Sequence, residues 1–191
     1  MNKDRTTTMT TPSPYDENKI ISTWDDLDLP ENVLRGIYGY GFERPSSIQQ
    51  KAVYPITCGR DVIAQAQSGT GKTGTFTIGS LSRIDPGLKQ TQILVLAPTH
   101  ELAHQIAGVF SALGQHISNF SARAFVGGTS VRDDIEAINR CTPVAAVGCP
   151  GRIADLIKKR ILSVEHVKIL VIDEADEMLD MGFADDLEAI L

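Results

Sequence analysis

A glycine-punctuated loop, Ala66–Thr73, has the residue types of a phosphate-binding site. Gly69 and Gly71 can adopt positive φ and let backbone N–H groups approach oxyanions, and the first turn of a following helix adds unpaired donors. Lys72 supplies a positive charge for the β- and γ-phosphates, and Thr73 supplies a hydroxyl for magnesium. The residues expected to bind the phosphates are Gln67, Ser68, Gly69, Thr70, Gly71, Lys72 and Thr73.

A pair of carboxylates, Asp173-Glu174, follows the apolar run Ile169–Ile172 and lies 101 residues after Lys72. Asp173 is suited to hold Mg²⁺ through water, because this ion prefers hard oxygen ligands and keeps several waters. Glu174 is suited to orient and deprotonate the water that attacks the γ-phosphate. Together with the glycine loop, the pair predicts an ATPase that uses ATP and Mg²⁺, with Lys72, Asp173 and Glu174 as catalytic residues.

Each motif alone also has an ordinary structural interpretation. The loop has Ala66 where a P-loop has its first glycine, and similar glycine spacing occurs in plain strand-to-helix turns. An Asp-Glu pair after a strand can be a solvated acidic turn. The ATPase interpretation is favoured because two separate halves of one mechanism occur in the same chain.

From Asp61 onward, the sequence alternates between apolar strands, turns and amphipathic helices. The apolar runs are continuous rather than alternating with polar residues, which suits parallel strands covered by helices on both faces. This pattern predicts a doubly wound α/β sheet, whose ligands bind beyond the carboxyl ends of the strands. The expected strands are Val62–Ala64, Ile93–Ala97, Ala122–Val126, Val144–Val147 and Ile169–Ile172.

We expect three segments along the chain. Residues 1–20 are rich in Thr and Pro without a periodic apolar pattern, and predict a disordered leader,. Residues 21–60 predict two helices, the first ending near Gly39 or Gly41 and the second capped by Ser46 or Ser47. Residues 61–191 form the sheet and its helices, and their last helical pattern meets no stop signal. We therefore expect the chain to be a part of a longer protein.

Composition limits the classes of function. A length of 191 residues fits one domain, and a net charge of −6 argues against binding nucleic acid through a generally basic surface,. Any nucleic-acid contact is then expected at local sites. The apolar runs are far shorter than the roughly 20 residues of a membrane helix. Three cysteines without close or metal-type spacing predict reduced thiols in an intracellular protein,.

The segment Asp173-Glu174-Ala175-Asp176, together with residues 34–50, resembles the DEAD-box RNA helicases and is most similar to their translation-initiation and exon-junction members. The resemblance runs from Thr23 to the end and implies the N-terminal RecA-like lobe of a P-loop NTPase. It implies that Gln49 hydrogen-bonds the adenine edge, that Phe42 stacks on the adenine, and that Asp176 couples this lobe to a second one. By residue type alone, Gln49 is expected on a helix surface.

Three further motifs match those that line the RNA track of this family. The resemblance implies RNA contacts at Pro98, Thr99, His100, Gly127, Gly128, Pro150, Gly151 and Arg152. Glycine N–H groups, helix N-termini and an arginine can hold successive phosphates without reading bases, although each motif alone would be expected as an ordinary turn or cap. His100 replaces the family's Arg and Cys149 its Thr, so the track loses a permanent charge and a hydroxyl.

The resemblance implies an ATP-dependent RNA helicase that unwinds RNA in translation initiation with a scaffold protein, in the cytoplasm. The isolated lobe is expected to be monomeric and nearly inactive, because a second lobe supplies arginine fingers and half of the RNA clamp. The alternative is an ATP-dependent RNA clamp or assembly factor of exon-junction type, which would be nuclear. A P-loop ATPase unrelated to RNA would leave Gly127-Gly128 and Pro150-Gly151-Arg152 unexplained.

Overall fold

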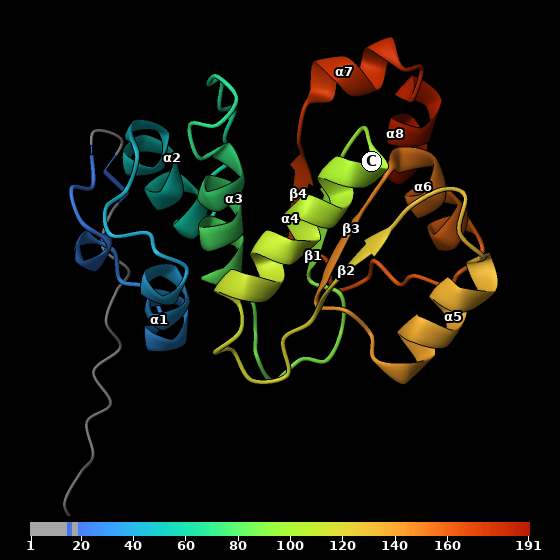
Figure 1. The fold of residues 1–191 in the computed structure, drawn as a ribbon, viewed down its shortest axis with the longest axis horizontal. Helices are drawn as coiled ribbons and strands as arrows, with labels where there is room; N and C mark the ends of the chain where they lie inside the picture. Colours follow the sequence, from blue (N-terminus) through green and yellow to red (C-terminus); the bar gives the residue numbers. More distant parts are fainter. Residues whose placement is uncertain (1–14, 17–18) are drawn as a thin grey trace, which may run out of the picture.

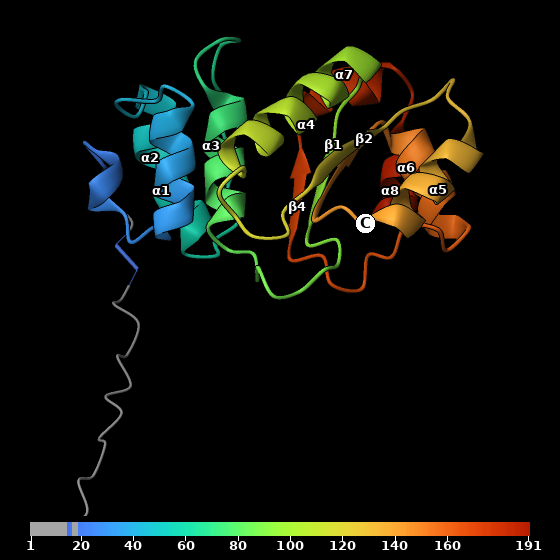
Figure 2. The same ribbon diagram turned by 60° about the horizontal axis from the view of Figure 1, so that its bottom comes forward.

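The computed structural model describes residues 15–16 and 19–191. The elements in chain order are a 3₁₀ turn at Trp24–Asp26, α1 (Glu31–Gly39), α2 (Ser47–Thr57), α3 (Lys72–Leu81), β1 (Ile93–Leu96), α4 (His100–Leu113), β2 (Ala122–Phe125), α5 (Val131–Arg140), β3 (Ala145–Gly148), α6 (Pro150–Lys158), β4 (Ile169–Ile172), α7 (Ala175–Asp180) and α8 (Ala184–Ile190). The sheet lies between α1, α2 and α3 on one side and α5, α6 and α8 on the other, as Figure 1 and Figure 2 show.

The four strands are parallel, in the order β2-β3-β1-β4. Alternate side chains of β1 enter two different hydrophobic clusters. Ile93 and Val95 pack with residues of α1 to α4, whereas Leu94 and Leu96 pack with residues of α5 to α8. All four side chains are buried, which explains why the strand is apolar throughout,. The predicted α/β class with helices on both faces of a parallel sheet is confirmed.

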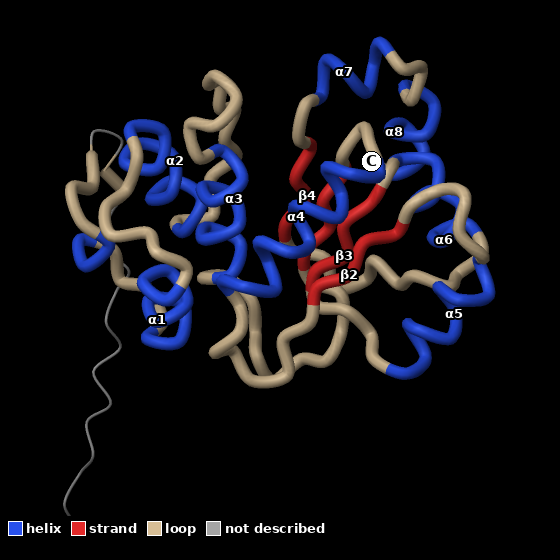
Figure 3. The backbone as a smooth tube through the Cα atoms, in the orientation of Figure 1, coloured by secondary structure: helices blue, strands red, loops and turns tan. Residues whose placement is uncertain are grey.

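The predicted strand at Val62–Ala64 is wrong. Residues 60–67 have no regular structure, Ile63 is fully exposed, and Figure 3 draws the segment as part of the loop that leads into α3. On this side the sheet ends at β4, where Leu170 and Ile172 are each 37% exposed. A strand forms only where its N–H and C=O groups find a neighbouring ladder. Among the described residues, the run at 62–64 has none.

The predicted helix signals mostly agree with the structure. Helix α1 ends at Gly39, and α2 follows Ser46, whose side chain forms a reciprocal capping box with Gln49,. Helices α5 and α7 have no counterpart among the predicted elements. The first is dominated by polar residues and the second has six residues, so neither carries a long apolar stripe,.

The helices that precede the phosphate loop belong to the same core as the sheet. Trp24 is fully buried in the cluster shared with α3, α4 and β1, and its Nε1–H donates to the Phe42 carbonyl oxygen at 2.9 Å. Of the predicted leader, residues 1–14 and 17–18 lie outside the described residues. Tyr15, which is described, stacks on the ring of Tyr54 with centroids 5.6 Å apart. Over the described residues, none of the helices combines the length and apolarity that a bilayer crossing requires.

Candidate nucleotide and RNA sites

The phosphate loop makes its turn with the glycines expected from the sequence. Gly69 and Gly71 have φ of 78° and 100°, and Gly71 is the N-cap of α3. The loop is held by two hydroxyls, since Thr70 Oγ1 donates to the Gln67 carbonyl oxygen at 2.6 Å and Ser46 Oγ donates to the Thr70 carbonyl oxygen at 2.8 Å. Helix α3 thus starts at Lys72 with its first backbone N–H groups beside this loop, as an anion site requires.

The strand β4 delivers the carboxylate pair to the same place. Lys72 Nζ lies 3.0 Å from Glu174 Oε1, so the two motifs meet across 102 residues of sequence. Glu174 has φ 53° and ψ 54°, a left-handed conformation that is unusual for a residue with a side chain,. Such outliers are concentrated at functional sites, because the surrounding structure must compensate for their strain.

Asp173 is the buried member of the pair, at 9% exposure, and its backbone N–H donates to the Leu96 carbonyl oxygen at 3.0 Å. Burial raises the pKa of its carboxyl, and the neighbouring charge of Glu174 raises it further. Lys72 acts in the opposite direction but does not outweigh these effects,. A cation at this carboxylate would relieve both burial and repulsion.

The residues present fit a magnesium ion that also binds phosphate oxygens and water. The Thr73 hydroxyl has no hydrogen-bond partner within the described part of the chain, so its oxygen is available. No group of three or more His, Cys, Asp or Glu side chains suited to a metal occurs among the described residues. Asp173 and Thr73 therefore suit an ion that arrives with a nucleotide, rather than a closed protein cage.

The residue type of Gln49 alone suggested a position on a helix surface. In the structure Gln49 is buried, with 2% exposure. Its Oε1 accepts the Ser46 N–H at 2.8 Å, and its Nε2 donates to the Gly71 carbonyl oxygen at 3.4 Å. One amide thus joins the cap of α2 to the N-cap of α3. The second amide hydrogen and the second lone pair are left for another partner.

Phe42 lies beside Gln49, against the first turn of α3. Its ring stacks with Trp24 at 6.4 Å and meets the edge of Tyr40 at 4.8 Å. A Cβ at Gly74 would lie 2.8 Å from Gln49 Nε2 and 2.9 Å from the Phe42 ring. Gly74 therefore permits this close approach. Sequence reasoning missed it because Gly74 lies inside a helical segment, after the glycines of the loop.

A second site is a cavity of about 620 Å³ at the carboxyl ends of β1, β2 and β3. It brings together six of the eight residues predicted to contact RNA, while Gly128 and Pro150 lie outside its lining. Sequence reasoning missed Val131, Asp155, Met181 and Phe183, which come from helices or turns without a recognised motif. The full lining is Pro98, Thr99, His100, Gly127, Val131, Cys149, Gly151, Arg152, Asp155, Met181 and Phe183.

The two positions that depart from the family pattern both line this cavity. His100 is exposed in the first turn of α4, and a Cβ at Gly127 would lie 3.4 Å from its Nε2. Cys149 is the N-cap of α6, where it makes no side-chain cap hydrogen bond. Its thiol lies 3.9 Å from the Pro98 carbonyl oxygen, and burial raises its pKa. A buried, protonated thiol contributes little to an anion site.

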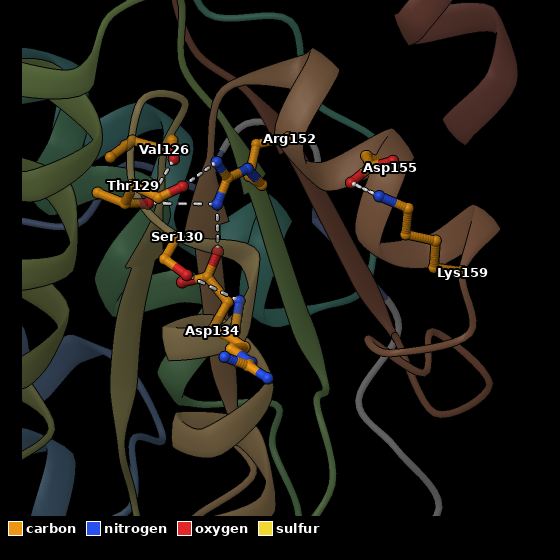
Figure 4. A network of polar contacts seen from close by, with 8 residues as sticks. Val126, Thr129, Ser130, Asp134, Arg152, Asp155 and Lys159 are labelled. Atoms are coloured by element: carbon orange, nitrogen blue, oxygen red, sulfur yellow. Dashed lines mark hydrogen bonds and ion pairs between the residues drawn. The ribbon is translucent and has the colours of Figure 1, made fainter.

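Arg152 lines the cavity, but its guanidinium makes three contacts with the protein itself. Its Nη1 contacts Asp134 Oδ2 at 2.5 Å and Thr129 Oγ1 at 3.2 Å, and its Nη2 donates to the Thr129 carbonyl oxygen at 2.8 Å (Figure 4). Asp176, the residue predicted to couple the lobes, is exposed in the first turn of α7.

A glycine loop at the start of a helix, meeting a carboxylate pair at the carboxyl end of a parallel strand, defines a P-loop nucleotide-binding domain of the α/β class. Residues 46–191 match the family model of the DEAD/DEAH box helicases, and the chain belongs to this family. It is 52% identical over 170 residues to the ATP-dependent RNA helicase eIF4A of Meyerozyma guilliermondii, covering 89% of this chain and 42% of that protein. It is 53% identical over 175 residues to eIF4A of Chaetomium globosum, and the match covers 92% of this chain and 43% of that protein.

Solved structures agree with this assignment. A DEAD box protein from the hyperthermophile Methanococcus jannaschii has a TM-score of 0.80 and 34% identity, covering 90% of this chain and 46% of that one. S. cerevisiae dbp5 L327V bound to gle1 H337R and IP6 has a TM-score of 0.81 and 33% identity, and the match covers 90% of this chain and 43% of that one. The chain spans less than half the length of these relatives.

Proposed function

We propose that this chain is the N-terminal, nucleotide-binding lobe of an ATP-dependent RNA helicase that acts in translation initiation. The observation that carries the proposal is the contact between Lys72 and Glu174, which brings the phosphate loop and the carboxylate pair together. The names of the eIF4A relatives support the initiation role, and they favour it over an exon-junction type of clamp. With this role we propose a cytoplasmic location and a scaffold protein of the initiation complex as partner.

In this proposal each residue of the site has a defined task. The N–H groups of the loop and the Lys72 ammonium bind the β- and γ-phosphates, and the Thr73 hydroxyl and Asp173 hold Mg²⁺, the latter through water. The ion supplies charge neutralisation between the phosphates. Glu174 orients the attacking water and accepts its proton, and its contact with Lys72 keeps it directed at the phosphate loop until nucleotide arrives.

We propose that adenine lies against Phe42 and uses the remaining donor and acceptor of Gln49. The structural support is the position of Gln49, whose amide already contacts the Gly71 carbonyl oxygen at the phosphate loop. RNA is proposed to lie over the cavity lined by Thr99, His100 and Gly127. An acidic chain with a net charge of −6 suits local, backbone-directed phosphate contacts rather than a broad basic surface,.

We expect the chain alone to be monomeric, to bind nucleotide and to hydrolyse it slowly. An arginine finger is worth about 10³–10⁵ in rate, and in this family we expect it on a second lobe. RNA-stimulated turnover by residues 1–191 at about 1 s⁻¹ or faster, in the range of complete enzymes, would contradict this expectation.

Competition binding tests the nucleotide site. Lys72→Ala removes the ammonium group that is proposed to bind phosphate. This variant should bind ATP in the presence of Mg²⁺ about tenfold or more weakly, since hydrogen bonds to charged groups are worth about 1.5–3 kcal/mol. The control is Lys89→Ala, which removes an exposed charge from a turn outside the site. Equal loss in both variants would refute the assignment.

A second experiment tests the adenine site. Gln49→Ala should reduce the preference for ATP over GTP, and Gln50→Ala should retain this preference.

A further inference from the structure

Arg152 lies at the start of α6, in a motif that would suggest a phosphate contact, yet its guanidinium is already engaged. Three of its interactions go to Asp134 and Thr129, and its side chain is 9% exposed. An arginine has five N–H donors in a rigid fork, and three contacts of this fork go to the protein,. With the side chain 9% exposed, little of the guanidinium surface is open to RNA.

Asp134 is the buried counter-charge of this arginine. It lies in the first turns of α5, is 4% exposed, and places Oδ2 at 2.5 Å from Arg152 Nη1. A carboxylate without a partner would be costly at this depth, so the pair holds together unless both groups are released to water. The positive charge of Arg152 is thereby neutralised within the fold.

The loop between β2 and α5 is fixed at both ends around this ion pair, as Figure 4 shows. Thr129 Oγ1 donates to the Val126 carbonyl oxygen at 2.9 Å, and Ser130 Oγ accepts the Arg132 N–H at 3.2 Å as the cap of α5. Arg152 then joins the Thr129 carbonyl oxygen to α6. The network spans Gly127 and Gly128, the glycine doublet of the proposed RNA track.

These contacts join two backbone elements of the cavity. Gly127 belongs to the fixed loop, Gly151 precedes Arg152 in α6, and both line the cavity. Gly128 has φ 76°, which glycine adopts without strain, so its own backbone preference does not fix the loop and the contacts of Thr129 and Arg152 are needed to hold it,. If RNA phosphates are bound by N–H groups of both elements, their separation decides how well successive phosphates fit.

We propose that Asp134 is a positioning residue for RNA. Through Arg152 and Thr129 it holds the loop at residues 127–129 at a fixed distance from the start of α6, and Arg152 itself does not bind phosphate. The inference rests on the proposed RNA-binding function. It gives Arg152 a geometric role in place of the ionic role that its motif suggests.

The test uses the complete 191-residue chain, a 10-nucleotide uridine oligonucleotide, and fluorescence anisotropy at several salt concentrations with Mg²⁺ and a non-hydrolysable ATP analogue. Asp134→Asn keeps the shape of the side chain but removes its charge. The matched control is Asp133→Asn, which makes the same charge change at the exposed neighbouring position. Asp134→Glu keeps the carboxylate and should retain most of the RNA affinity. ATP affinity verifies that each variant is folded.

We expect Asp134→Asn to bind RNA about tenfold more weakly than Asp133→Asn, with the same slope of log K against log salt. A phosphate ligand contributes about one unit to that slope. Arg152→Lys should therefore also weaken RNA binding, and the slope should stay unchanged. If Asp134→Asn binds RNA more tightly with a steeper slope, Arg152 is a phosphate ligand that Asp134 restrains, and the proposal is overturned. Equal affinities of the two Asn variants would overturn it as well.

Amide hydrogen exchange in the absence of RNA separates this proposal from the function on which it rests. Asp134→Asn should accelerate exchange at residues 127–129 and 151 several-fold relative to Asp133→Asn, because the loop loses its tie to α6. Unchanged exchange at these amides would refute the positioning role. Failure of the unmodified chain to bind the oligonucleotide, with faster exchange in Asp134→Asn, would instead refute the RNA-binding function and leave the tie between loop and helix established.

Discussion

The backbone of Gly36 in α1 lies directly against the backbone of Leu113 at the end of α4, and a Cβ at Gly36 would overlap the Leu113 carbonyl oxygen. This is where α1, which precedes the loop that carries Phe42 and the helix α2 that carries Gln49, docks on α4. Because the obstacle is backbone, a side-chain rotation cannot relieve the overlap.

Gly36→Ala should therefore destabilise the protein by about 2–3 kcal/mol, the upper part of the range for overpacking, despite the better helix propensity of alanine. The matched control is Gly108→Ala in α4, where a Cβ meets nothing within 4 Å. That substitution should stabilise the protein by about 0.5–1 kcal/mol. Urea unfolding measures both, and equal effects of the two would mean that α1 does not dock on Leu113.

Asp173→Asn should stabilise the metal-free protein. Burial and Glu174 raise the pKa of Asp173. A carboxyl whose pKa is raised by folding stabilises the fold while it is protonated at low pH, and this contribution is lost as the pH rises through the folded pKa. At pH 8 the wild-type protein bears the cost of a buried carboxylate, which asparagine removes.

We expect a Tm increase of about 2–4 °C at pH 8, corresponding to about 1 kcal/mol, and a smaller increase as the pH approaches 4. Asp61→Asn, at an exposed loop position, is the control for lost charge and should change Tm little. A gain that is the same at both pH values would show that ionisation of Asp173 is not its source. The same substitution should weaken Mg²⁺-dependent ATP binding.

Cys149→Thr should stabilise α6, because its N-cap makes no side-chain hydrogen bond. A threonine hydroxyl can accept a backbone N–H of the first turn, an interaction worth about 0.5–2 kcal/mol. Cys149→Val has the same branched shape without the hydroxyl and is the control. Thermal unfolding should place the threonine variant above the valine variant, and the reverse order would indicate that this cap is satisfied in another way.

The meeting of the glycine loop at residues 66–73 with the carboxylate pair could be predicted because both motifs depend on local sequence. A glycine turn, a following helix and a carboxylate pair after an apolar strand are each encoded within a few residues, and the parallel sheet brings them together, as with Lys72 and Glu174. The run at Val62–Ala64 shows the limit of such patterns. Its apolar residues match a strand, but pairing depends on a neighbouring strand, which the pattern does not report.

The sequence also did not predict which polar residues are buried. Gln49 and Asp134 are polar types expected at the surface, and each has a distant partner in the fold, Gly71 or Arg152, while Gln49 also accepts a local hydrogen bond from Ser46,. Such partners lie 18 to 22 residues away, and no periodicity identifies them. These two buried polar groups join elements of the proposed nucleotide site and of the proposed RNA site.

The last prediction concerns His100, which lines the cavity where the family has arginine. His100→Arg restores a permanent charge and a planar donor fork beside Gly127,. At pH 7.5 this variant should bind the uridine oligonucleotide several-fold more tightly, with a salt slope steeper by about one unit, because one more counterion is released. His104→Arg adds the same charge to an exposed position one turn along α4 and should leave the slope nearly unchanged. If the two variants behave alike, the gain comes from net charge, and His100 does not face the RNA backbone.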